Sequence, residues 1–388
     1  MADVLKKSET TLAHILKKEQ NRQKKTINLI ASENIAPKGV RELLGSEFTN
    51  KYTEGYPGKR YYPGCKNYDE IEILAQQRAR KAFGLSSRWS VNAQAYSGAI
   101  ANMAIYLGLL KPGDSVLAMD LSSGGHLSHG SKASITGKLF SFLHYGVDSN
   151  YIIDYTAIEK LAKKHKPKLI VSGASAYPGK IDFKKIGTIA KKVGAYHMAD
   201  ISHYAGLISA GAYPSPFPYA DVVMTTTHKS LLGPRAALIF SRNEEIGNKI
   251  DKAIFPGLQG GPHMNTIAAI AHGLLLVQKP AFKKYAKQVI KNAYTLAKEL
   301  QKLGFEIVGR GTGSHLLLVD VSKKGMNGKI AEEKLEKAGI LANRNTIAGD
   351  ASPQTPSAIR LGTYWVTMRG MKEREMKRIA GEIAQVIC

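Results

Sequence analysis

Between residues 115 and 240 the chain alternates short apolar runs with longer stretches whose apolar residues recur at helical spacing. The apolar runs predict five strands, at Ser115–Met119, Leu169–Ser172, Tyr196–Ala199, Asp221–Thr225 and Ala236–Phe240. Helices are predicted at Tyr155–Lys164 and Asp182–Val193, the second with Asp182 as its N-cap and Gly194 as its stop. This alternation is typical of an α/β fold, a mostly parallel sheet flanked by helices.

Beyond residue 272 the pattern becomes that of a smaller α+β domain. An apolar stripe over Phe282–Leu303 predicts a long helix that stops at Gly304. Strands at Phe305–Val308 and His315–Val321, and helices at Ile330–Ala338 and Met371–Ile387, are predicted after it. The first 45 residues indicate a charged helix and then an irregular stretch. We predict an N-terminal helix and arm over residues 1–45, a large domain over 46–272 and a small domain over 273–388.

Composition and charge narrow the class of protein. The 388 residues include 55 Lys and Arg against 31 Asp and Glu, a formal net charge of +24. The lysines are spread over predicted helices, so they indicate solvated faces rather than a nucleic-acid-binding surface. The two cysteines, Cys65 and Cys388, cannot build a metal cluster or a disulfide framework. The N-terminus has no apolar run, and no apolar stretch reaches the ~20 residues needed to span a membrane. We therefore expect a cytoplasmic protein, and the few cysteines lead us to expect no metal site.

Unusual polar residues follow two of the predicted strands. Asp200 is followed by His203, and the run 225–227 (Thr-Thr-Thr) leads into His228 and Lys229. In an open α/β sheet, functional groups gather beyond the carboxyl ends of the strands. A lysine there can form a Schiff base with pyridoxal phosphate, and an aspartate can keep the pyridine nitrogen protonated. Alone, Lys229 fits a solvated loop residue better, but the combination predicts a pyridoxal phosphate site.

The phosphate of such a cofactor needs a cradle. Ser97, Gly98 and Ala99 open an apolar helical pattern over Ile100–Leu110, and a helix N-terminus offers free N–H groups to a dianion. The same residues also fit an ordinary helix cap. The glycine-rich run 256–262, which contains Gly261, fits either a second phosphate contact or a tight turn.

Several longer motifs resemble the serine hydroxymethyltransferase family of fold-type-I pyridoxal phosphate enzymes, and the resemblance covers nearly the whole chain. The motifs are Leu29-Ile30-Ala31-Ser32-Glu33-Asn34, residues 50–62 (Asn-Lys-Tyr-Thr-Glu-Gly-Tyr-Pro-Gly-Lys-Arg-Tyr-Tyr), Gly124-Gly125-His126-Leu127-Ser128-His129-Gly130 and Thr225-Thr226-Thr227-His228-Lys229. Two segments depart from the family pattern. Residues 97–102 are Ser-Gly-Ala-Ile-Ala-Asn, where the family usually has Ser-Gly-Ser-Gln-Ala-Asn. Residues 362–365 are Gly-Thr-Tyr-Trp, where the family usually has Gly-Thr-Pro-Ala.

The resemblance implies a role for each matching residue. Lys229 would carry the cofactor, Arg360 would hold the substrate carboxylate, and Glu54 would act as acid and base. The implied catalytic group is Lys229, Glu54, His228, Thr226 and Tyr62. The implied cofactor contacts are Tyr52, Ser97, Gly98, Ala99, His126, Ser175, Asp200, His203, Lys229 and Gly261. The implied substrate contacts are Ser32, Tyr62, His203 and Arg360, and the implied pterin contacts are Leu121, Gly125, His126, Leu127 and Asn345.

The resemblance also implies a homodimer, because Tyr52 and Gly261 would reach the phosphate from a neighbouring subunit. The predicted reaction is glycine hydroxymethyltransferase activity: reversible transfer of the serine hydroxymethyl group to tetrahydrofolate or an archaeal-type tetrahydropterin, giving glycine. Two other interpretations stay open, a pterin-independent aldolase for threonine-like substrates and a basic nucleic-acid-binding protein on the same fold. Dependence of serine cleavage on added tetrahydropterin separates the first, and salt-dependent RNA binding without cofactor absorbance would favour the second.

Overall fold

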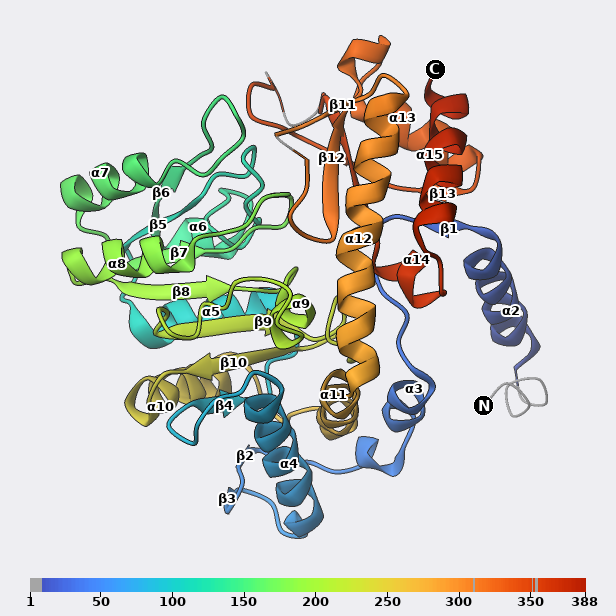
Figure 1. Cartoon of the computed structure of the whole chain (residues 1–388). Helices are drawn as coiled ribbons and strands as arrows, with labels where there is room; N and C mark the ends of the chain where they lie inside the picture. The colour runs from blue at the N-terminus through green and yellow to red at the C-terminus, as the bar shows by residue number, and fades with distance from the viewer. Residues whose placement is uncertain (1–8, 310, 351, 353–354) are drawn as a thin grey trace.

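A computed structural model describes residues 9–309, 311–350, 352 and 355–388. Its largest sheet has seven strands in the order β4-β10-β9-β8-β7-β5-β6 (Figure 1). The parallel strands are β5 (Ser115–Met119), β6 (Ser141–Tyr145), β7 (Leu169–Ser172), β8 (Tyr196–Asp200) and β9 (Val222–Thr226). β10 (Ala237–Ser241) runs antiparallel to both of its neighbours, β9 and β4 (Ser90–Asn92). The mostly parallel sheet predicted from the sequence is therefore confirmed.

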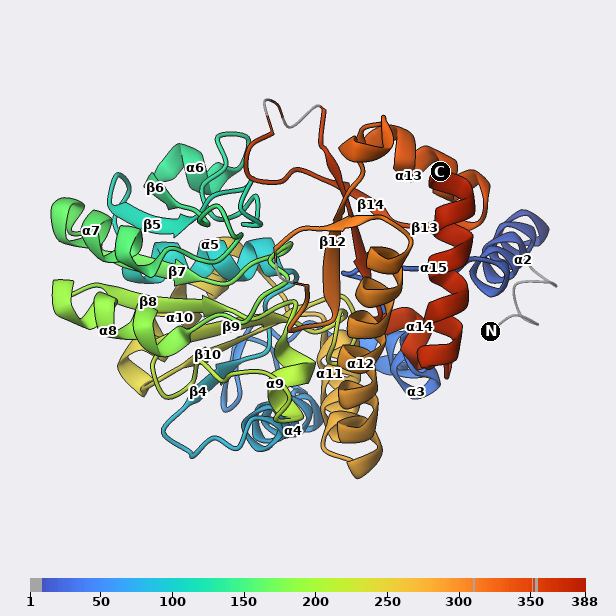
Figure 2. The ribbon, with the colours of Figure 1, turned by 45° about the horizontal axis from the view of Figure 1, so that its top comes forward.

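Both faces of the central part of this sheet are buried, which explains why β7 and β9 are continuous buried runs. On β5, Leu117 and Met119 pack into one apolar cluster, and Val116 and Ala118 pack into another. The first cluster includes residues of α4 (Lys66–Ala82), α7 (Tyr155–His165) and α8 (Phe183–Val193). The second includes residues of α5 (Gly98–Leu109) and α10 (Glu244–Lys252). Helices thus cover both faces of the sheet (Figure 2).

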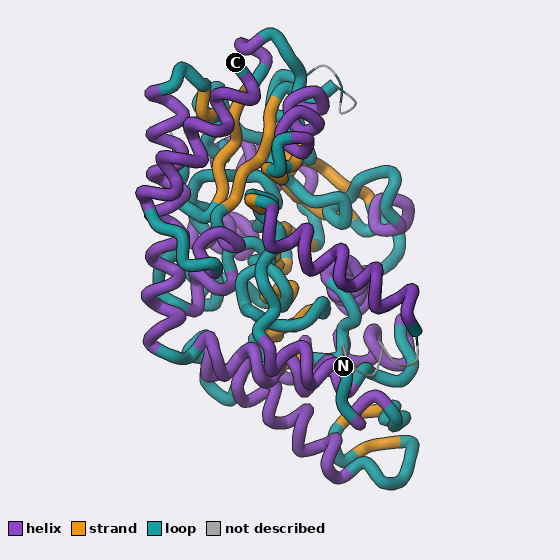
Figure 3. The backbone as a smooth tube through the Cα atoms, turned by 90° about the vertical axis from the view of Figure 1, so that its right-hand side faces the viewer, coloured by secondary structure: helices purple, strands orange, loops and turns teal. Residues whose placement is uncertain are grey.

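A second sheet is antiparallel and has the order β11-β12-β15-β14. Its strands are β11 (Glu306–Ile307), β12 (Leu316–Asp320), β14 (Asn343–Asn345) and β15 (Ala358–Gly362). The long helix α12 (Pro280–Lys302) packs against α15 (Glu373–Ile387), and α13 (Gly328–Lys337) completes this unit, in which helices lie beside the strands (Figure 3). α11 (Met264–Val277) runs across residues 272 and 273, and the domain limits stay a prediction.

The N-terminal segment joins the C-terminal unit. β1 (Ile27–Asn28) pairs in parallel with β13 (Ile340–Leu341), and the backbone N–H of Gly362 donates to the carbonyl of Leu29 at 2.7 Å. A Cβ on Gly362 would lie 2.3 Å from Ala31 Cα, so only glycine allows this approach. The predicted charged helix is α2 (Thr10–Lys25), which buries none of its residues and lies at the edge of the molecule (Figure 1). Arg369 holds its C-terminal end by donating to the carbonyl of Lys24 at 3.0 Å. The arm after it was predicted to be irregular, but it contains a second helix, α3 (Lys38–Leu44).

Several element limits differ from the sequence prediction. β9 and β10 each begin and end one residue later than predicted. The short strand β4 and the strand β6 were not predicted, and neither was α4, whose buried face is mostly alanine. None of the helices in the described part of the chain combines the length and the apolar composition that crossing a membrane requires.

Candidate active site

The carboxyl ends of β7, β8 and β9 border a cavity of about 480 Å³. Asp200 ends β8, Thr226 ends β9, and Lys229 follows three residues later. The first turn of α5 forms a second wall, and Arg360 of the smaller sheet forms a third. The topology of the two sheets therefore brings together polar residues that are far apart in the sequence.

Hydrogen bonds hold both carboxylate oxygens of Asp200. Oδ1 accepts from Ser202 Oγ at 2.6 Å, and Oδ2 lies 3.2 Å from both His129 Nε2 and Asn102 Nδ2. Burial raises the pKa of Asp200. The hydrogen bond and electrostatic interaction with His129, together with the charge of Lys229, outweigh burial and hold that pKa well below its ordinary value. Asp200 is therefore a fixed negative charge in the cavity wall.

Lys229 brings an amine to the same cavity. Burial lowers the pKa of Lys229 to about 8, the charges of Arg360 and Arg235 act in the same direction, and Asp200 opposes them. Within the described chain the Lys229 amine has no hydrogen bond or ion pair. An amine that loses its proton this readily is a usable nucleophile near neutral pH.

Arg360 presents a guanidinium that no carboxylate neutralises in the part of the chain that the structure describes. Nη1 donates to the carbonyl of Ser175 at 2.8 Å, and Nη2 donates to Asn343 Oδ1 at 2.9 Å. Burial lowers the pKa of Arg360 to about 10, so the group is still charged at neutral pH. None of the described carboxylates lies within ion-pair distance of it, and its buried Nε has no partner in the described residues. A buried cation without a counterion favours an anionic ligand.

The N-terminus of α5 is a second place for an anion. Ser97 caps this helix, and Ser97, Gly98 and Ala99 all line the cavity. A Cβ on Gly98 would lie 2.7 Å from Thr226 Cγ2, so glycine lets the helix begin close to β9. Free backbone N–H groups and the positive end of the helix dipole stabilise negative charge here.

Three further cavity residues have buried polar atoms without a partner in the described chain, namely Asn102 Oδ1, Thr226 Oγ1 and His228 Nδ1. Buried polar atoms are nearly always hydrogen-bonded in folded proteins. Together with the reactive amine of Lys229 and the two anion sites, they indicate a polar ligand with at least one negative group.

Comparison with known proteins decides which chemistry this is. The sequence model of the family described as "Serine hydroxymethyltransferase" matches residues 5–383. The chain belongs to this family. Two relatives named serine hydroxymethyltransferase, one from a Nitratiruptor species and one from Endomicrobium trichonymphae, are each 52% identical to it. Each alignment covers 99% of this chain and 92% of the relative.

Membership of the serine hydroxymethyltransferase family confirms the resemblance and the fold-type-I α/β class. It also confirms the predicted glycine hydroxymethyltransferase activity on serine and glycine, with pyridoxal phosphate as cofactor and tetrahydrofolate as co-substrate. The pterin-independent aldolase is not favoured.

Most residues that the resemblance singled out line the one cavity. They are Ser32, Ser97, Gly98, Ala99, His126, Ser175, Asp200, His203, Thr226, His228, Lys229 and Arg360. The other predicted residues lie outside the cavity wall of this single chain, in two groups.

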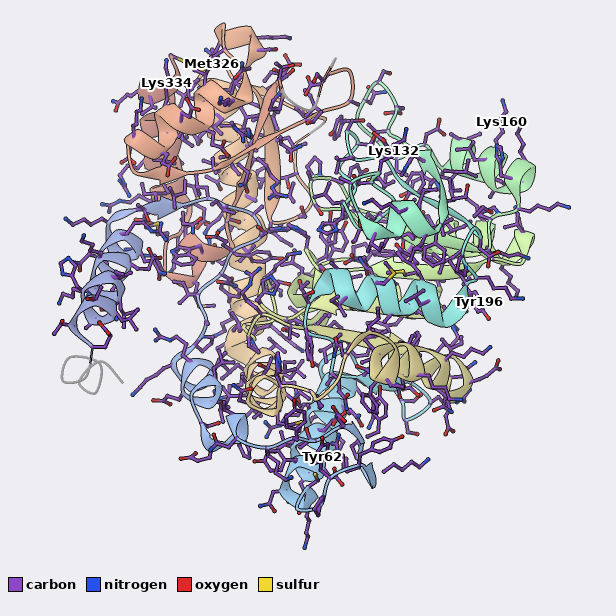
Figure 4. The ribbon with its side chains drawn as sticks, turned by 180° about the vertical axis from the view of Figure 1, so that it is seen from behind. Tyr62, Lys132, Lys160, Tyr196, Met326 and Lys334 are labelled. Atoms are coloured by element: carbon purple, nitrogen blue, oxygen red, sulfur yellow. The ribbon has the colours of Figure 1, made fainter. Side chains whose placement is uncertain are left out.

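The first outlying group is Tyr52, Glu54, Tyr62 and Gly261. The rings of Tyr52 and Tyr62 lie 5.3 Å apart, and a Cβ on Gly261 would lie 3.0 Å from the ring of Tyr52. Tyr52 is 61% exposed, and Tyr62 lies beside α4 at the edge of the molecule (Figure 4). These residues therefore form a cluster of their own on the surface.

The second outlying group is the predicted pterin contacts other than His126. Leu121 and Leu127 are exposed in the loop after β5, and Gly125 is buried in the same loop. Asn345 ends β14, and its side-chain amide donates to the carbonyl of Thr346 at 2.6 Å.

Sequence reasoning gave no role to four residues that shape the cavity. His129, Asn102 and Ser202 hold Asp200, and Arg235 contributes positive charge next to Lys229. The sequence could have indicated two of these residues. His129 lies in the motif of residues 124–130, and Asn102 lies one helical turn after Gly98, on the same face of the predicted helix. Arg235 follows a turn between two strands and carries no recognisable pattern.

Proposed function

We propose that the protein binds pyridoxal phosphate and serine in the cavity between the two sheets, with Lys229 as the covalent attachment point. One observation carries the assignment: an amine with a pKa of about 8 shares the cavity with an ionised aspartate and an uncompensated arginine. Lysine, aspartate and arginine are the groups that the cofactor's aldehyde, its pyridine nitrogen and an amino-acid carboxylate require.

The cavity residues fit the cofactor. The N-terminus of α5 would hold the phosphate, and Asp200 would hold the pyridinium proton, with His126, Ser175 and His203 around the ring. The unpartnered Asn102 Oδ1, Thr226 Oγ1 and His228 Nδ1 leave hydrogen-bonding capacity for a ligand. When bound, pyridoxal phosphate supplies an electron sink for the carbanion that develops at the substrate Cα.

The chain's own groups orient the substrate. Arg360 would bind the carboxylate through parallel N–H groups, with Ser32 beside it, and so fix which Cα bond faces the ring. The Lys229 amine would accept and return a proton close to this carbon, because its pKa lies near the working pH.

We further propose a homodimer in which each active site takes Tyr52, Glu54, Tyr62 and Gly261 from the partner. These residues lie together on the surface, outside the cavity of their own chain. α2 has no buried residue, and its apolar side chains Leu12 and Ile15 are each 55% exposed. Exposed apolar side chains on one helix favour packing against a second copy of the chain. A closed two-fold dimer uses one such patch twice. Glu54 would then act as acid and base near the serine hydroxyl, beside a pterin held by Leu121, Gly125, Leu127 and Asn345.

Cytoplasmic location is also proposed, because Cys65 and Cys388 are both free thiols, as in proteins of reducing compartments. Nucleic acid is not proposed as a partner. Several basic side chains have local acidic partners, for example Lys163 and Lys192 with Glu159.

Borohydride reduction of the cofactor-loaded enzyme, followed by peptide mapping, tests the attachment point. The label should be on Lys229, and Lys229→Ala should lose both the label and serine cleavage. Lys160 on the exposed face of α7 is the matched control, and Lys160→Ala should keep both (Figure 4). A label on a lysine other than Lys229 refutes the assignment.

Complementation tests the shared site. Glu54→Gln and Lys229→Ala homodimers should each be nearly inactive. Refolding them together gives about half heterodimers, each with one intact site of two, so about a quarter of wild-type activity should return. If Glu54 and Lys229 of one site came from the same chain, the mixture would stay inactive while mass spectrometry shows heterodimers.

A further inference from the structure

We propose that His315 is a positioning residue for His203, and that Tyr364 holds both in place. The three residues form a column of rings that begins at the cavity and leads into the smaller sheet unit. His203 lines the cavity, His315 directly precedes β12, and Tyr364 begins α14 (Tyr364–Met368). The inference rests on the proposed role of His203 beside the cofactor and adds the residues that fix its ring.

The contacts hold His203 at two points. His203 Nδ1 lies 3.3 Å from His315 Nε2, with the two ring centroids 5.4 Å apart and the ring planes inclined by 28°. Tyr364 stacks on His315, and the centroids of these two rings lie 4.2 Å apart. Its hydroxyl donates to the backbone carbonyl of His203 at 2.7 Å. Tyr364 therefore fixes the His203 backbone directly and the His203 ring through His315.

Backbone hydrogen bonds and burial fix the end of the column that lies away from the cavity. The backbone N–H of Thr363 donates to the carbonyl of His315 at 3.0 Å, and Tyr285 Oη donates to the carbonyl of Tyr364 at 3.1 Å. His315 and Tyr364 are almost completely buried. Neither ring can turn without displacing the other.

The contact between the two imidazoles selects which ring nitrogen of His203 meets a ligand. Burial and the charges of Lys229 and Arg360 lower the pKa of His203 well below its ordinary value, and burial and Arg360 do the same to the pKa of His315. Both rings are therefore neutral, and one donates the hydrogen bond that the other accepts. Because Nδ1 of His203 is used in this bond, only Nε2 is left for the cavity, and the bond stops the ring from flipping.

The column depends on an aromatic residue with a hydroxyl at position 364, which is Tyr in this chain. A proline, which the resemblance implies at this position, would supply neither the stacked ring nor the hydroxyl.

Three variants separate the contacts. His315→Phe keeps a stacked ring and loses the nitrogen, His315→Gln keeps a hydrogen-bonding group, and Tyr364→Phe loses only the hydroxyl. His197 is the matched control: it is buried, bonds Ser172 Oγ at 2.8 Å, and does not line the cavity. Each variant is combined with His203→Phe in a double-mutant cycle, and kcat/KM for serine is measured.

If His315 acts through His203, His315→Phe should lower kcat/KM roughly ten- to hundredfold, and its effect should vanish when His203 is already Phe. His315→Gln should restore part of the loss, and Tyr364→Phe should show a smaller loss. His197→Phe should add fully to His203→Phe. Additive losses for His315→Phe, or wild-type kcat/KM in a folded His315→Phe protein, would overturn the proposal.

A measurement on the cofactor-free protein tests the positioning role of His315 independently of the proposed role of His203 in the reaction. In histidine ¹⁵N spectra, His203 should show one tautomer in the wild type and exchange between tautomers in His315→Phe. Should His315→Phe not fold, His315→Gln and Tyr364→Phe carry the test, with more tautomer exchange expected in Tyr364→Phe. Wild-type His203 signals in both would overturn the positioning role. Unchanged activity in His203→Phe would refute only the proposed role of His203.

Discussion

The reactivity of Lys229 should titrate far below that of an ordinary lysine. Its pKa falls from 10.5 to about 8, mainly because burial disfavours the charged amine. At pH 7.5 about a quarter of the amine is then neutral, against about 0.1% without the shift, a gain of roughly 200-fold in nucleophile. The same shift means that keeping Lys229 charged in the folded chain costs roughly 3 kcal/mol relative to water.

Competitive acetylation of the cofactor-free protein measures this titration at single lysines, with mass spectrometry of the peptides as readout. Labelling of Lys229 should level off with a midpoint near pH 8, and the exposed Lys160 serves as internal reference. Arg235→Gln should raise the midpoint, because it removes a positive neighbour, and Asp200→Asn should lower it, because it removes a negative one. A Lys229 signal that still rises tenfold per unit above pH 9.5 would refute the burial argument, as would shifts of opposite sign in the two variants.

Four other changes test separate features. Asp200→Asn should slow exchange of the glycine α-proton by several orders of magnitude, because the pyridine nitrogen loses its charge partner; NMR showing wild-type exchange contradicts this. Arg360→Lys should weaken serine binding and lower kcat/KM with unchanged cofactor content, since the fork geometry is lost; a near-normal KM would place the carboxylate site elsewhere. Leu117→Ala, in the sheet core, should lower the free energy of unfolding in urea by about 2–5 kcal/mol, and a loss below about 1 kcal/mol would count against close packing there. Gly362→Ala should destabilise the protein because its Cβ meets the backbone of Ala31, and an unchanged Tm would disprove that contact.

The periodic parts of the sequence predicted the fold well. β5 and β7 have the predicted limits, and α8 has the predicted Asp182 N-cap and a left-handed Gly194 at its end. These elements were predictable because each shows a local pattern that matches its burial in the fold. A buried strand appears as an apolar run, and a helix with one buried face appears as an apolar stripe with a cap at each end. β6 was missed because several of its residues are only partly buried or exposed, so it lacks a continuous apolar run.

The candidate site was predictable where motifs are local and unpredictable where only folding brings residues together. Asp200 and Lys229 could be found because Asp200 ends β8 and Lys229 follows β9, two neighbouring strands of the parallel part of the sheet. The contact between His203 and His315 joins the loop after β8 to the residue before β12, and no spacing in the sequence indicates it. The hydrogen bonds of His129 and Asn102 to Asp200 depend in the same way on how α5 and the loop after β5 pack.

The pairing of β1 with β13 has a consequence for synthesis on the ribosome. Ile27 pairs with Ile340, so roughly 310 further residues must be added before the partner strand exists, which takes roughly 15–60 s at the usual elongation rates. Leu29, fully buried in the finished protein, is left without its core during that time and is a natural target for chaperones that bind nascent apolar segments. Synthesis of β13, rather than the folding of any local element, therefore sets the earliest moment at which β1 can join the unit that carries Arg360.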